Sequence, residues 1–296
     1  MTHREIHTLS LLCLKEISKA PAHHIDEFRW HRAFSNFPIT LQNKVTQEII
    51  NHITEAGRMN DSSIPLQAFN RDMLELSLKN SKVSENFIMG ATARCPNLTS
   101  IDVSGCLLVD TSVLQKILQS CPSLTDVSIR NCRKQTDDAS DCLIKHCRHL
   151  TRLNIGGNIN MTTDGIIHLL RNHPNNRHFR ELYLSGLPIT EAVLDTLVQR
   201  CPALTHISIG YAIITESVLR RFLQARGGDL ISLNISWMTA FDAKDNISVD
   251  ILDCILSTCP RLTSLDVSGL RNITVQAVQA FIEQKKLQAS DTVLVG

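Results

Sequence analysis

The sequence predicts an α/β solenoid, a stack of repeats that each contain one short strand and one helix. Three observations predict this class. The phrase Cys-Pro-x-Leu-Thr recurs along the 296-residue chain, an apolar triplet begins at the leucine of each copy, and a helix-initiating residue follows each triplet. Hydrophobic residues make up 43% of the chain but aromatic residues only 4%, so the core is built from Leu, Ile and Val, which favours repeats.

The triplets predict the strands. Complete copies of the phrase occupy 95–99, 121–125, 201–205 and 259–263, and residues 147–151 form a copy without the proline. The last two apolar positions of a triplet flank one polar residue, which predicts a short strand of a buried parallel sheet. From one triplet to the next the steps are 25, 26, 26, 29, 25, 26 and 32 residues, a period near 26. The middle residues of the triplets are Leu76, Ile101, Val127, Leu153, Leu182, Ile207, Leu233 and Leu265.

A helix is expected after each strand. Each begins at a polar residue whose side-chain oxygen can accept a hydrogen bond from the first turn, and helical apolar spacing such as Val113/Leu114/Ile117/Leu118 follows. The expected cap residues are Ser84, Asp110, Thr136, Thr162, Thr190, Thr215, Ser248 and Thr274. Residues 292–295 are expected to add a last strand that closes the array.

Neighbouring repeats must cover each other's apolar faces, because one repeat cannot bury its own. Eight strands stacked about 4.8 Å apart give a sheet roughly 34 Å across. The sequence therefore predicts a horseshoe arc, with short parallel strands on the concave face, helices outside and a helical cap at the N-terminus. Residues 1–69 are expected to form the cap, and residues 70–296 the array of about eight repeats with its capping strand.

Composition limits the partners. The formal net charge is +1 and no block of like charges occurs, so neither nucleic acid nor a membrane surface is an expected ligand. The apolar stretch from Leu9 to Leu14 is too short for a secretory signal and is followed at once by Lys15. We therefore expect a cytoplasmic or nuclear chain with free thiols and a protein partner.

The pattern C-P-x-L-x-x-L-x-L-x-x-C, followed by an Ile/Val-Ser/Thr/Asp cap, resembles the cysteine-containing leucine-rich repeats of F-box/LRR proteins. The resemblance covers about residues 70–285 and implies the same solenoid. The Cys or Asn expected three residues after the last strand position is kept at Cys106, Cys132 and Asn158 but not in later repeats, which are expected to lack part of the side-chain ladder. The later residues are Leu187, Ala212, Met238 and Leu270.

The N-terminal segment carries two short patterns. Residues 8–17 fit an elongin-binding box with Leu9, Cys13 and Ile17 along one helical face, and residues 37–45 fit a cullin box. The residues of the second pattern are Phe37, Pro38, Leu41 and Val45. This layout resembles the antagonist-of-mitotic-exit-network proteins and the Zyg-eleven substrate receptors. It implies a substrate-recognition subunit of a cullin-type ubiquitin ligase, docked through elongin C or a Skp-type adaptor and a cullin.

Other interpretations stay open. The helices of the N-terminal segment would also serve as a plain solenoid cap with no docking role. The sequence after Pro38 does not show the second and third helices that a true F-box requires. The array would then be a ligase-independent scaffold or sequestering protein that acts on a cell-cycle regulator, as the mitotic-exit resemblance also suggests.

The sequence predicts no enzyme, metal site or cofactor. Cys142, His146, Cys147 and His149 lie close together, but Cys147 occupies the buried slot of the repeat, whereas Cys142 aligns with Lys116 on the expected exposed helix face. Cysteines in the repeat phase behave as small buried apolar residues rather than as nucleophiles.

The partner-binding surface is expected on the concave face, where most side chains are small and polar. Bulky side chains of types that dominate interfaces stand out against this background. They are Arg130, Arg152, Tyr183, Tyr211 and Trp237. Tyr211 and Trp237 could equally cover the strand ends of neighbouring repeats. The step of 32 residues predicts an insertion at about 239–246 that contacts the ligand.

Overall fold

The computed structural model describes residues 39–55, 57, 59–239, 247–285 and 292–294, with side chains from residue 44 onward. The chain divides into two compact units. Unit 1 comprises Met1–Lys134 with His146–His149, and unit 2 comprises Gln135–Lys145 with Leu150–Gly296. The predicted boundary between residues 69 and 70 stays a prediction.

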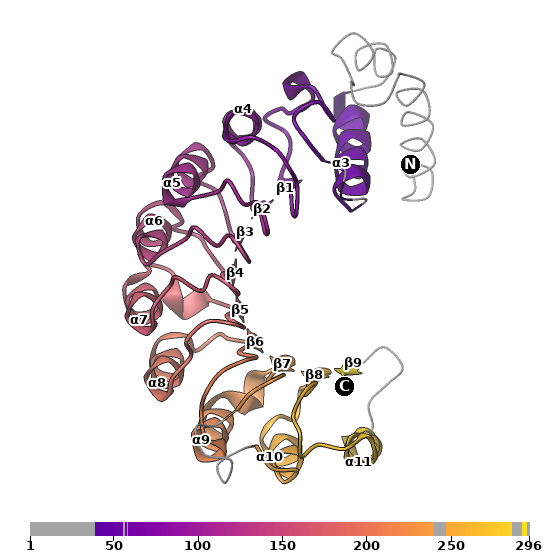
Figure 1. The fold of residues 1–296 in the computed structure, drawn as a ribbon, viewed down its shortest axis with the longest axis vertical. Helices are drawn as coiled ribbons and strands as arrows, with labels where there is room; N and C mark the ends of the chain where they lie inside the picture. The colour runs from indigo at the N-terminus through magenta and orange to yellow at the C-terminus, as the bar shows by residue number, and fades with distance from the viewer. Residues whose placement is uncertain (1–38, 56, 58, 240–246, 286–291, 295–296) are drawn as a thin grey trace. The chain divides into compact units, whose positions relative to one another are not determined.

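Unit 1 contains the first strands, which pair in chain order and in parallel (Figure 1). Register places the middle residues Leu76, Ile101 and Val127 side by side. The elements are α3 (Ile39–Glu55), η1 (Leu66–Ala68), β1 (Glu75–Ser77), α4 (Glu85–Arg94), β2 (Ser100–Asp102), α5 (Thr111–Ser120) and β3 (Asp126–Ser128).

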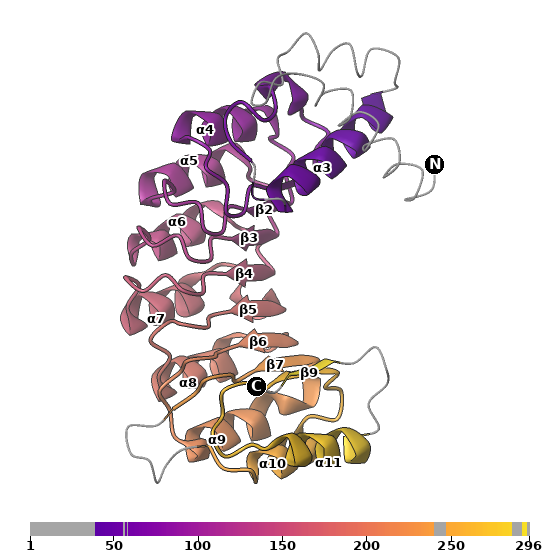
Figure 2. The same cartoon turned by 45° about the vertical axis from the view of Figure 1, so that its right-hand side comes forward.

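Helix α3 packs beside β1 (Figure 1) and lies across that end of the unit (Figure 2). Val45, Ile49 and Ile50 on this helix are fully buried, and the Thr54 hydroxyl donates to the carbonyl of Ser77 at 3.2 Å. The helical cap expected before the first repeat is therefore present from Ile39 onward, and it covers a strand that would otherwise lack a neighbour on that side.

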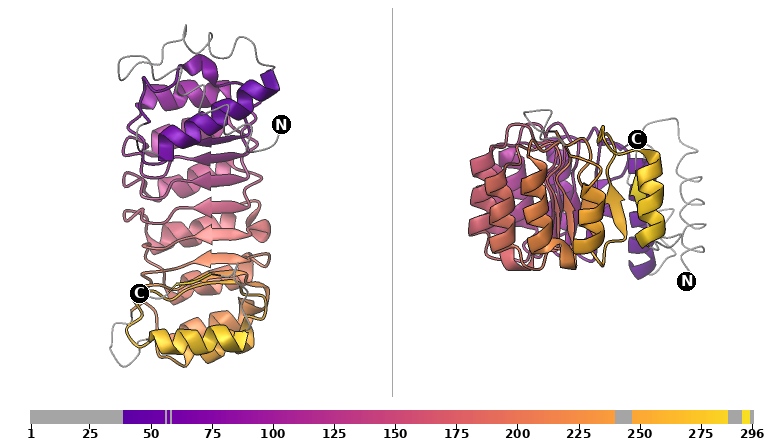
Figure 3. Two further views of the ribbon diagram at one scale, coloured as in Figure 1. Left: turned by 90° about the vertical axis from the view of Figure 1, so that its right-hand side faces the viewer. Right: turned by 90° about the horizontal axis from the view of Figure 1, so that it is seen from below.

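Unit 2 repeats the same design, with its parallel strands stacked in chain order and their helices on one face (Figure 3). The last strand, β9, lies within residues 292–295, where the sequence predicts a strand that closes the array. The elements are α6 (Asp138–His146), β4 (Arg152–Asn154), α7 (Thr163–Asn172), η2 (Asn176–His178), β5 (Glu181–Tyr183), α8 (Glu191–Arg200), β6 (His206–Ser208), α9 (Glu216–Arg226), η3 (Gly227–Asp229), β7 (Ser232–Asn234), α10 (Ile251–Thr258), β8 (Ser264–Asp266), α11 (Val275–Lys285) and β9 (Thr292–Leu294).

The predicted strand register is confirmed. In unit 2, Leu153, Leu182, Ile207, Leu233 and Leu265 pair in one row, and each is at most 1% exposed. The residues on either side of these five middle residues keep more exposure, so one face of each of these strands is buried beneath the helices. The α/β leucine-rich-repeat solenoid is thus the fold of this chain.

Most of the expected helix caps are found. Ser84, Asp110, Thr162, Thr215 and Thr274 each accept a hydrogen bond from the amide three residues later. This is the bond that satisfies an otherwise unpaired amide of the first turn. Thr190 is the residue before α8, but its side chain makes no cap bond.

Two predicted caps are wrong. Helix α6 begins at Asp138, so Asp137 and not Thr136 is the residue directly before it. The carboxylate of Asp137 accepts hydrogen bonds from the backbone amide and the hydroxyl of Thr162 in the next repeat. Ser248 instead accepts from the amide of Asp250, so α10 begins only at Ile251.

The side-chain ladder follows the predicted departure. The thiols of Cys106 and Cys132 donate to the carbonyls of Leu78 and Val103 in the preceding repeat, at 3.0 and 3.2 Å. The apolar residues that replace them later in the chain are buried. Because a methyl or methylene group cannot donate, those repeats keep the packing and lose the hydrogen bond.

A matched pair of threonines tests the cap. The Thr162→Ala variant loses its cap bond and its bond to Asp137, and we expect its free energy of unfolding to fall by about 1 kcal/mol. The Thr190→Ala variant removes no cap bond, and its cost should stay below about 0.5 kcal/mol. Urea denaturation of both variants measures the difference, and equal losses would contradict the assigned capping roles.

Candidate functional site

The strand face of unit 2 is an open surface lined by side chains from neighbouring strands. We define it as the side of β4–β9 that lies opposite the helices of unit 2 (Figure 1). Its side chains flank the buried middle residues and are mostly small and polar. Two of the five predicted contact residues, Arg152 and Tyr183, lie on this face, on neighbouring strands.

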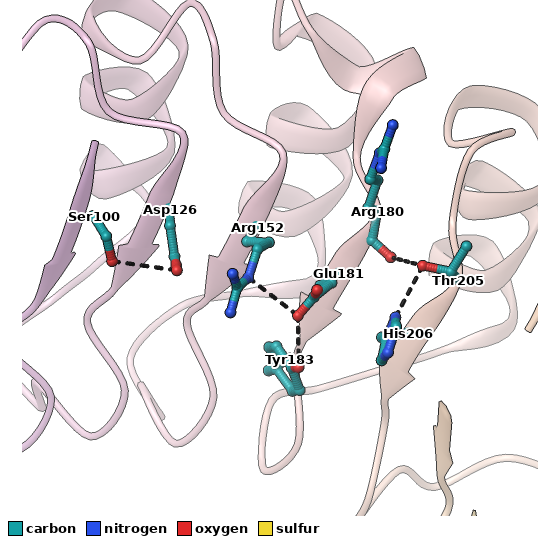
Figure 4. A network of polar contacts seen from close by, with 8 residues as sticks. All are labelled: Ser100, Asp126, Arg152, Arg180, Glu181, Tyr183, Thr205 and His206. Atoms are coloured by element: carbon teal, nitrogen blue, oxygen red, sulfur yellow. Dashed lines mark hydrogen bonds and ion pairs between the residues drawn. The ribbon is translucent and has the colours of Figure 1, made fainter. Parts of the chain in front are cut away.

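Arg152 and Tyr183 are joined by a carboxylate (Figure 4). The Nε atom of Arg152 lies 3.2 Å from Oε2 of Glu181, and the hydroxyl of Tyr183 donates to the same oxygen at 2.8 Å. The Arg152 side chain is 53% exposed and that of Glu181 20% exposed, so the ion pair adds little stability. Its effect is to hold a guanidinium and a phenol ring in fixed positions on an open face.

Sequence reasoning missed Glu181. Arg152 and Glu181 are direct register partners on β4 and β5, although 29 residues separate them in the sequence. Aligning the triplets of these repeats would have placed the two side chains opposite each other, where unlike charges attract. That alignment was the available signal.

Further polar pairs continue along the strand face of unit 2. Ser185 and Ser208 share a hydrogen bond between their hydroxyls, and the amide of Gly210 donates to Ser185 at 2.9 Å. Asn234 donates to a carboxylate oxygen of Asp266 at 2.8 Å. Because these groups already bind one another, the face has a fixed pattern of donors and acceptors.

Unit 1 has its own strand face. Ser100 donates to Asp126 at 3.3 Å, and the hydroxyls of Ser104 and Ser128 are 2.7 Å apart. Arg130 is exposed in the turn after β3, and its carbonyl accepts from the amide of Gly105. Arg130 therefore belongs to a different unit from the other four predicted contact residues.

Tyr211 and Trp237 do not lie on the strands. They occupy the turns after β6 and β7, where their rings stack with centroids 6.2 Å apart and planes 7° from parallel. Tyr211 is 58% exposed and Trp237 51% exposed. Their position therefore fits the second interpretation, in which they cover the strand ends, better than a position on the strand face.

The turns explain this placement. At the same position of each described repeat, φ is positive, with values of 66° at Tyr211 and 56° at Trp237. At most of these positions, including Tyr211 and Trp237, the amide donates to a carbonyl of the next repeat: Tyr211 to Ser236 and Trp237 to Ser268. The other residues at this position are Asn80, Gly105, Asn131, Gly157, Gly186 and Gly269, which tolerate this conformation better than an aromatic residue does.

The nine cysteines in the described ranges are buried, which disfavours nucleophilic chemistry. Burial raises the pKa of the Cys95 thiol to about 11 and of the Cys121 and Cys201 thiols to about 12. Cys142 is buried as well, contrary to the exposed position expected from its alignment with Lys116, and burial raises its pKa too. Within the part of the chain that the structure describes, no three His, Cys, Asp or Glu side chains form a group able to hold a metal ion.

The predicted docking residues are placed only in part. Leu9, Cys13, Ile17, Phe37 and Pro38 lie outside the described residues, as does most of the insertion, 240–246. Leu41 belongs to α3, but its side chain also lies outside the described part. Val45 is fully buried in unit 1 and presents no surface to a partner in this conformation.

No protein-family model matches the chain, and no curated protein matches it. Among solved structures, it is similar to the yeast complex of Rad7 and Elc1, at 13% identity and a TM-score of 0.49, covering 99% of this chain and 92% of that one. It is also similar to the leucine-rich-repeat protein LegL7 of Legionella pneumophila, at 14% identity and a TM-score of 0.48, covering 89% and 95%. A third similar structure is the internalin InlF of Listeria monocytogenes, at 16% identity and a TM-score of 0.43, covering 86% of this chain and 69% of that one. No helix in the described ranges combines the length and apolarity needed to cross a membrane.

The thiol pKa values predict low reactivity. At pH 8 iodoacetamide should leave Cys121 and Cys201 unmodified in the folded chain and modify both in guanidinium chloride, because only the thiolate reacts. Peptide mass spectrometry measures the modified fraction. An exposed reference thiol at Ser217→Cys in α9 should react in the folded state, and equal rates at Cys201 would contradict its burial.

The same shift gives stability a pH dependence. Above pH 9 the unfolded chain releases thiol protons that the folded chain retains until about pH 12. The unfolded state then binds fewer protons, so the free energy of unfolding should fall as the pH rises through this window. Replacing Cys201 by Ala should reduce the slope of urea midpoint against pH, and an unchanged slope would contradict the contribution of this thiol.

Proposed function

We propose that this chain is a protein-binding module whose strand face in unit 2 recognises a protein partner. The observation that carries the proposal is the cluster of Arg152, Glu181 and Tyr183. Arg and Tyr are the side-chain types that dominate interface energies, and here a shared carboxylate holds both before any partner arrives. A face with such fixed side chains loses less conformational entropy on binding than one with mobile side chains.

We further propose that the module is the substrate-recognition subunit of a cullin-type ubiquitin ligase in the cytoplasm or nucleus. The support is the order of the sequence patterns, with the elongin-type and cullin-type boxes directly before the repeats. Leu9, Cys13 and Ile17 would contact elongin C or a Skp-type adaptor. Phe37 and Pro38, just before α3, would contact the cullin, with Leu41 beside them.

One observation favours the ligase-independent alternative. Val45, the last residue of the cullin-type pattern, is fully buried in unit 1 beside Ile49. Part of that pattern is therefore accounted for by the packing of the cap. In this second candidate function the chain sequesters a protein, for example a cell-cycle regulator, and recruits no ligase.

Variants at the two sites separate the candidates. Affinity capture of the full chain from cells, followed by mass spectrometry, should recover elongin C or a Skp-type adaptor with a cullin and a further partner. The Leu9→Asp variant should lose the ligase subunits by at least about tenfold and keep the partner, since one lost anchor costs about 2 kcal/mol. The Arg152→Glu variant should lose the partner and keep the ligase subunits.

The control is Arg171→Glu on α7, an exposed residue in the last turn of a helix. It makes the same charge change away from the strand face and should behave as wild type. Absence of elongin, Skp-type adaptor and cullin from the wild-type capture would eliminate the ligase role. Retention of the partner by both Arg152→Glu and Tyr183→Ala would eliminate the strand face as the binding surface.

A further inference from the structure

A second exposed surface lies beside the strand face, along the loops that lead from the strands of unit 2 to their helices. We call it the loop edge and define it as residues 156–164, 185–192, 210–217, 236–239 and 247–250. Large apolar side chains are exposed on it, at 69% for Ile159, 47% for Ile213, and more than half for Tyr211 and Trp237. Exposed apolar side chains that recur at fixed repeat positions mark an interaction surface.

The loop edge has one sign of charge. Its described residues include the carboxylates Asp164, Glu191, Glu216 and Asp250 and no Lys, Arg or His. Arg221 binds Glu191, and Arg220 binds Glu216 and also lies within electrostatic reach of Asp250. The four carboxylates still outnumber the two arginines, and Asp164 and Asp250 are exposed. A surface of this kind repels phosphate groups and favours a cationic partner.

The aromatic stack is open at one end. Trp237 lies over Gly269, where a Cβ atom would come within 2.3 Å of its ring, and Tyr211 stacks on Trp237 from the preceding repeat. Gly186 occupies the same position one repeat earlier, and a Cβ atom there would meet only the backbone of Gly157 within 4 Å. The space next to Tyr211 along the row is therefore not filled by the chain at that position.

The backbone gives an independent reason to assign the two rings a role in binding. Left-handed φ values are costly for large side chains, and strain of this kind collects at functional sites. The other described repeats have Gly or Asn at this position, which fold the same turn without the cost. An aromatic pair at this position therefore carries a backbone cost that Gly or Asn would avoid, which favours a role in binding.

We infer that the loop edge of unit 2 binds an arginine-bearing segment of a partner protein, with a guanidinium extending the stack from Tyr211 across Gly186. The planar guanidinium stacks on aromatic faces, and the carboxylates of the surrounding loops complement its charge. Apolar residues of the same segment cover Ile159 and Ile213. This inference rests on the proposed protein-binding function and names the chemistry of the partner.

The test uses the purified full chain and a short fluorescent peptide in which Arg and Leu alternate, with Lys-for-Arg and Glu-for-Arg versions. Fluorescence anisotropy should show binding in the order Arg, Lys, Glu, with no binding of the Glu peptide. The Tyr211→Gly and Trp237→Gly variants place at each turn the residue that other repeats use. Each variant should lower the affinity for the Arg peptide about 3- to 30-fold, while the thermal unfolding midpoint of the chain stays the same or rises.

Two further variants sharpen the test. Gly186→Asn fills the space beside Tyr211 with a residue that the turn accepts at Asn80, and it should weaken binding as well. Leu107→Ala in unit 1 removes an equally exposed apolar residue from the corresponding loop and should change nothing. In a Trp30→Phe background, Trp237 is the remaining tryptophan, and its fluorescence should change on titration with the Arg peptide.

The outcomes distinguish this inference from the function on which it rests. Peptide binding that survives Trp237→Gly, or equal binding of the Glu peptide, overturns the inference. Absence of peptide binding also overturns it, and the proposed function stands if Arg152→Glu still abolishes capture of the cellular partner. A fall in the thermal midpoint of both glycine variants would show that the rings serve stability instead, and would overturn it too.

Discussion

Each repeat places one apolar residue at the centre of its strand, and only neighbouring repeats can cover it. In unit 2 the row from Leu153 to Leu265 is paired in register and almost completely buried. Removing one such side chain exposes the rows on both sides, so the cost is shared by three repeats rather than one. Every other feature of the solenoid, including its polar surfaces, is positioned by this row.

Hydrogen bonds at both ends of the strands fix the spacing that the buried row requires. Before β5, the amides of Arg180 and Glu181 donate to the carbonyl of Thr151 in the preceding repeat. After β6, the left-handed turn directs the amide of Tyr211 to the carbonyl of Ser236 in the next repeat. These bonds use backbone groups alone, so the side chains beside them are free to vary without altering the stack. This is why small, polar and aromatic residues can occupy equivalent positions.

The sequence was sufficient for the features that depend on local pattern. The apolar triplets and the cap residues predicted the strand centres, the last strand and most helix caps, because each repeat buries the same apolar positions against its neighbours. Thr136 is not the cap, since α6 begins only at Asp138, and Asp137 between them binds Thr162 in the next repeat, 25 positions away. A pattern read within one repeat contains no information about such a contact.

The same limit explains the candidate site. Tyr211 and Trp237 were assigned to the concave face because they are bulky residues next to the strand positions, but they lie in the turns after β6 and β7, where φ is positive. Arg152 and Tyr183 lie on strands, as expected, whereas Glu181, which joins them, is found only when the triplets of neighbouring repeats are aligned, in the register that β4 and β5 adopt. What a periodic sequence specifies well is the repeated core, and what it specifies poorly is the set of contacts that differ from repeat to repeat.

Those differing contacts are where a repeat protein acquires specificity. A Tyr or Trp in a left-handed turn costs about 1–3 kcal/mol, and the turn persists because the backbone bonds on both sides determine it. The buried row therefore supplies the stability that permits residues unfavourable to folding on the loop edge. On the strand face the satisfied pairs, such as Asn234 with Asp266, add rigidity instead. Unit 2 thus combines a rigid polar surface with an adjacent strained aromatic one, an arrangement that a partner with both polar and cationic groups can engage at once.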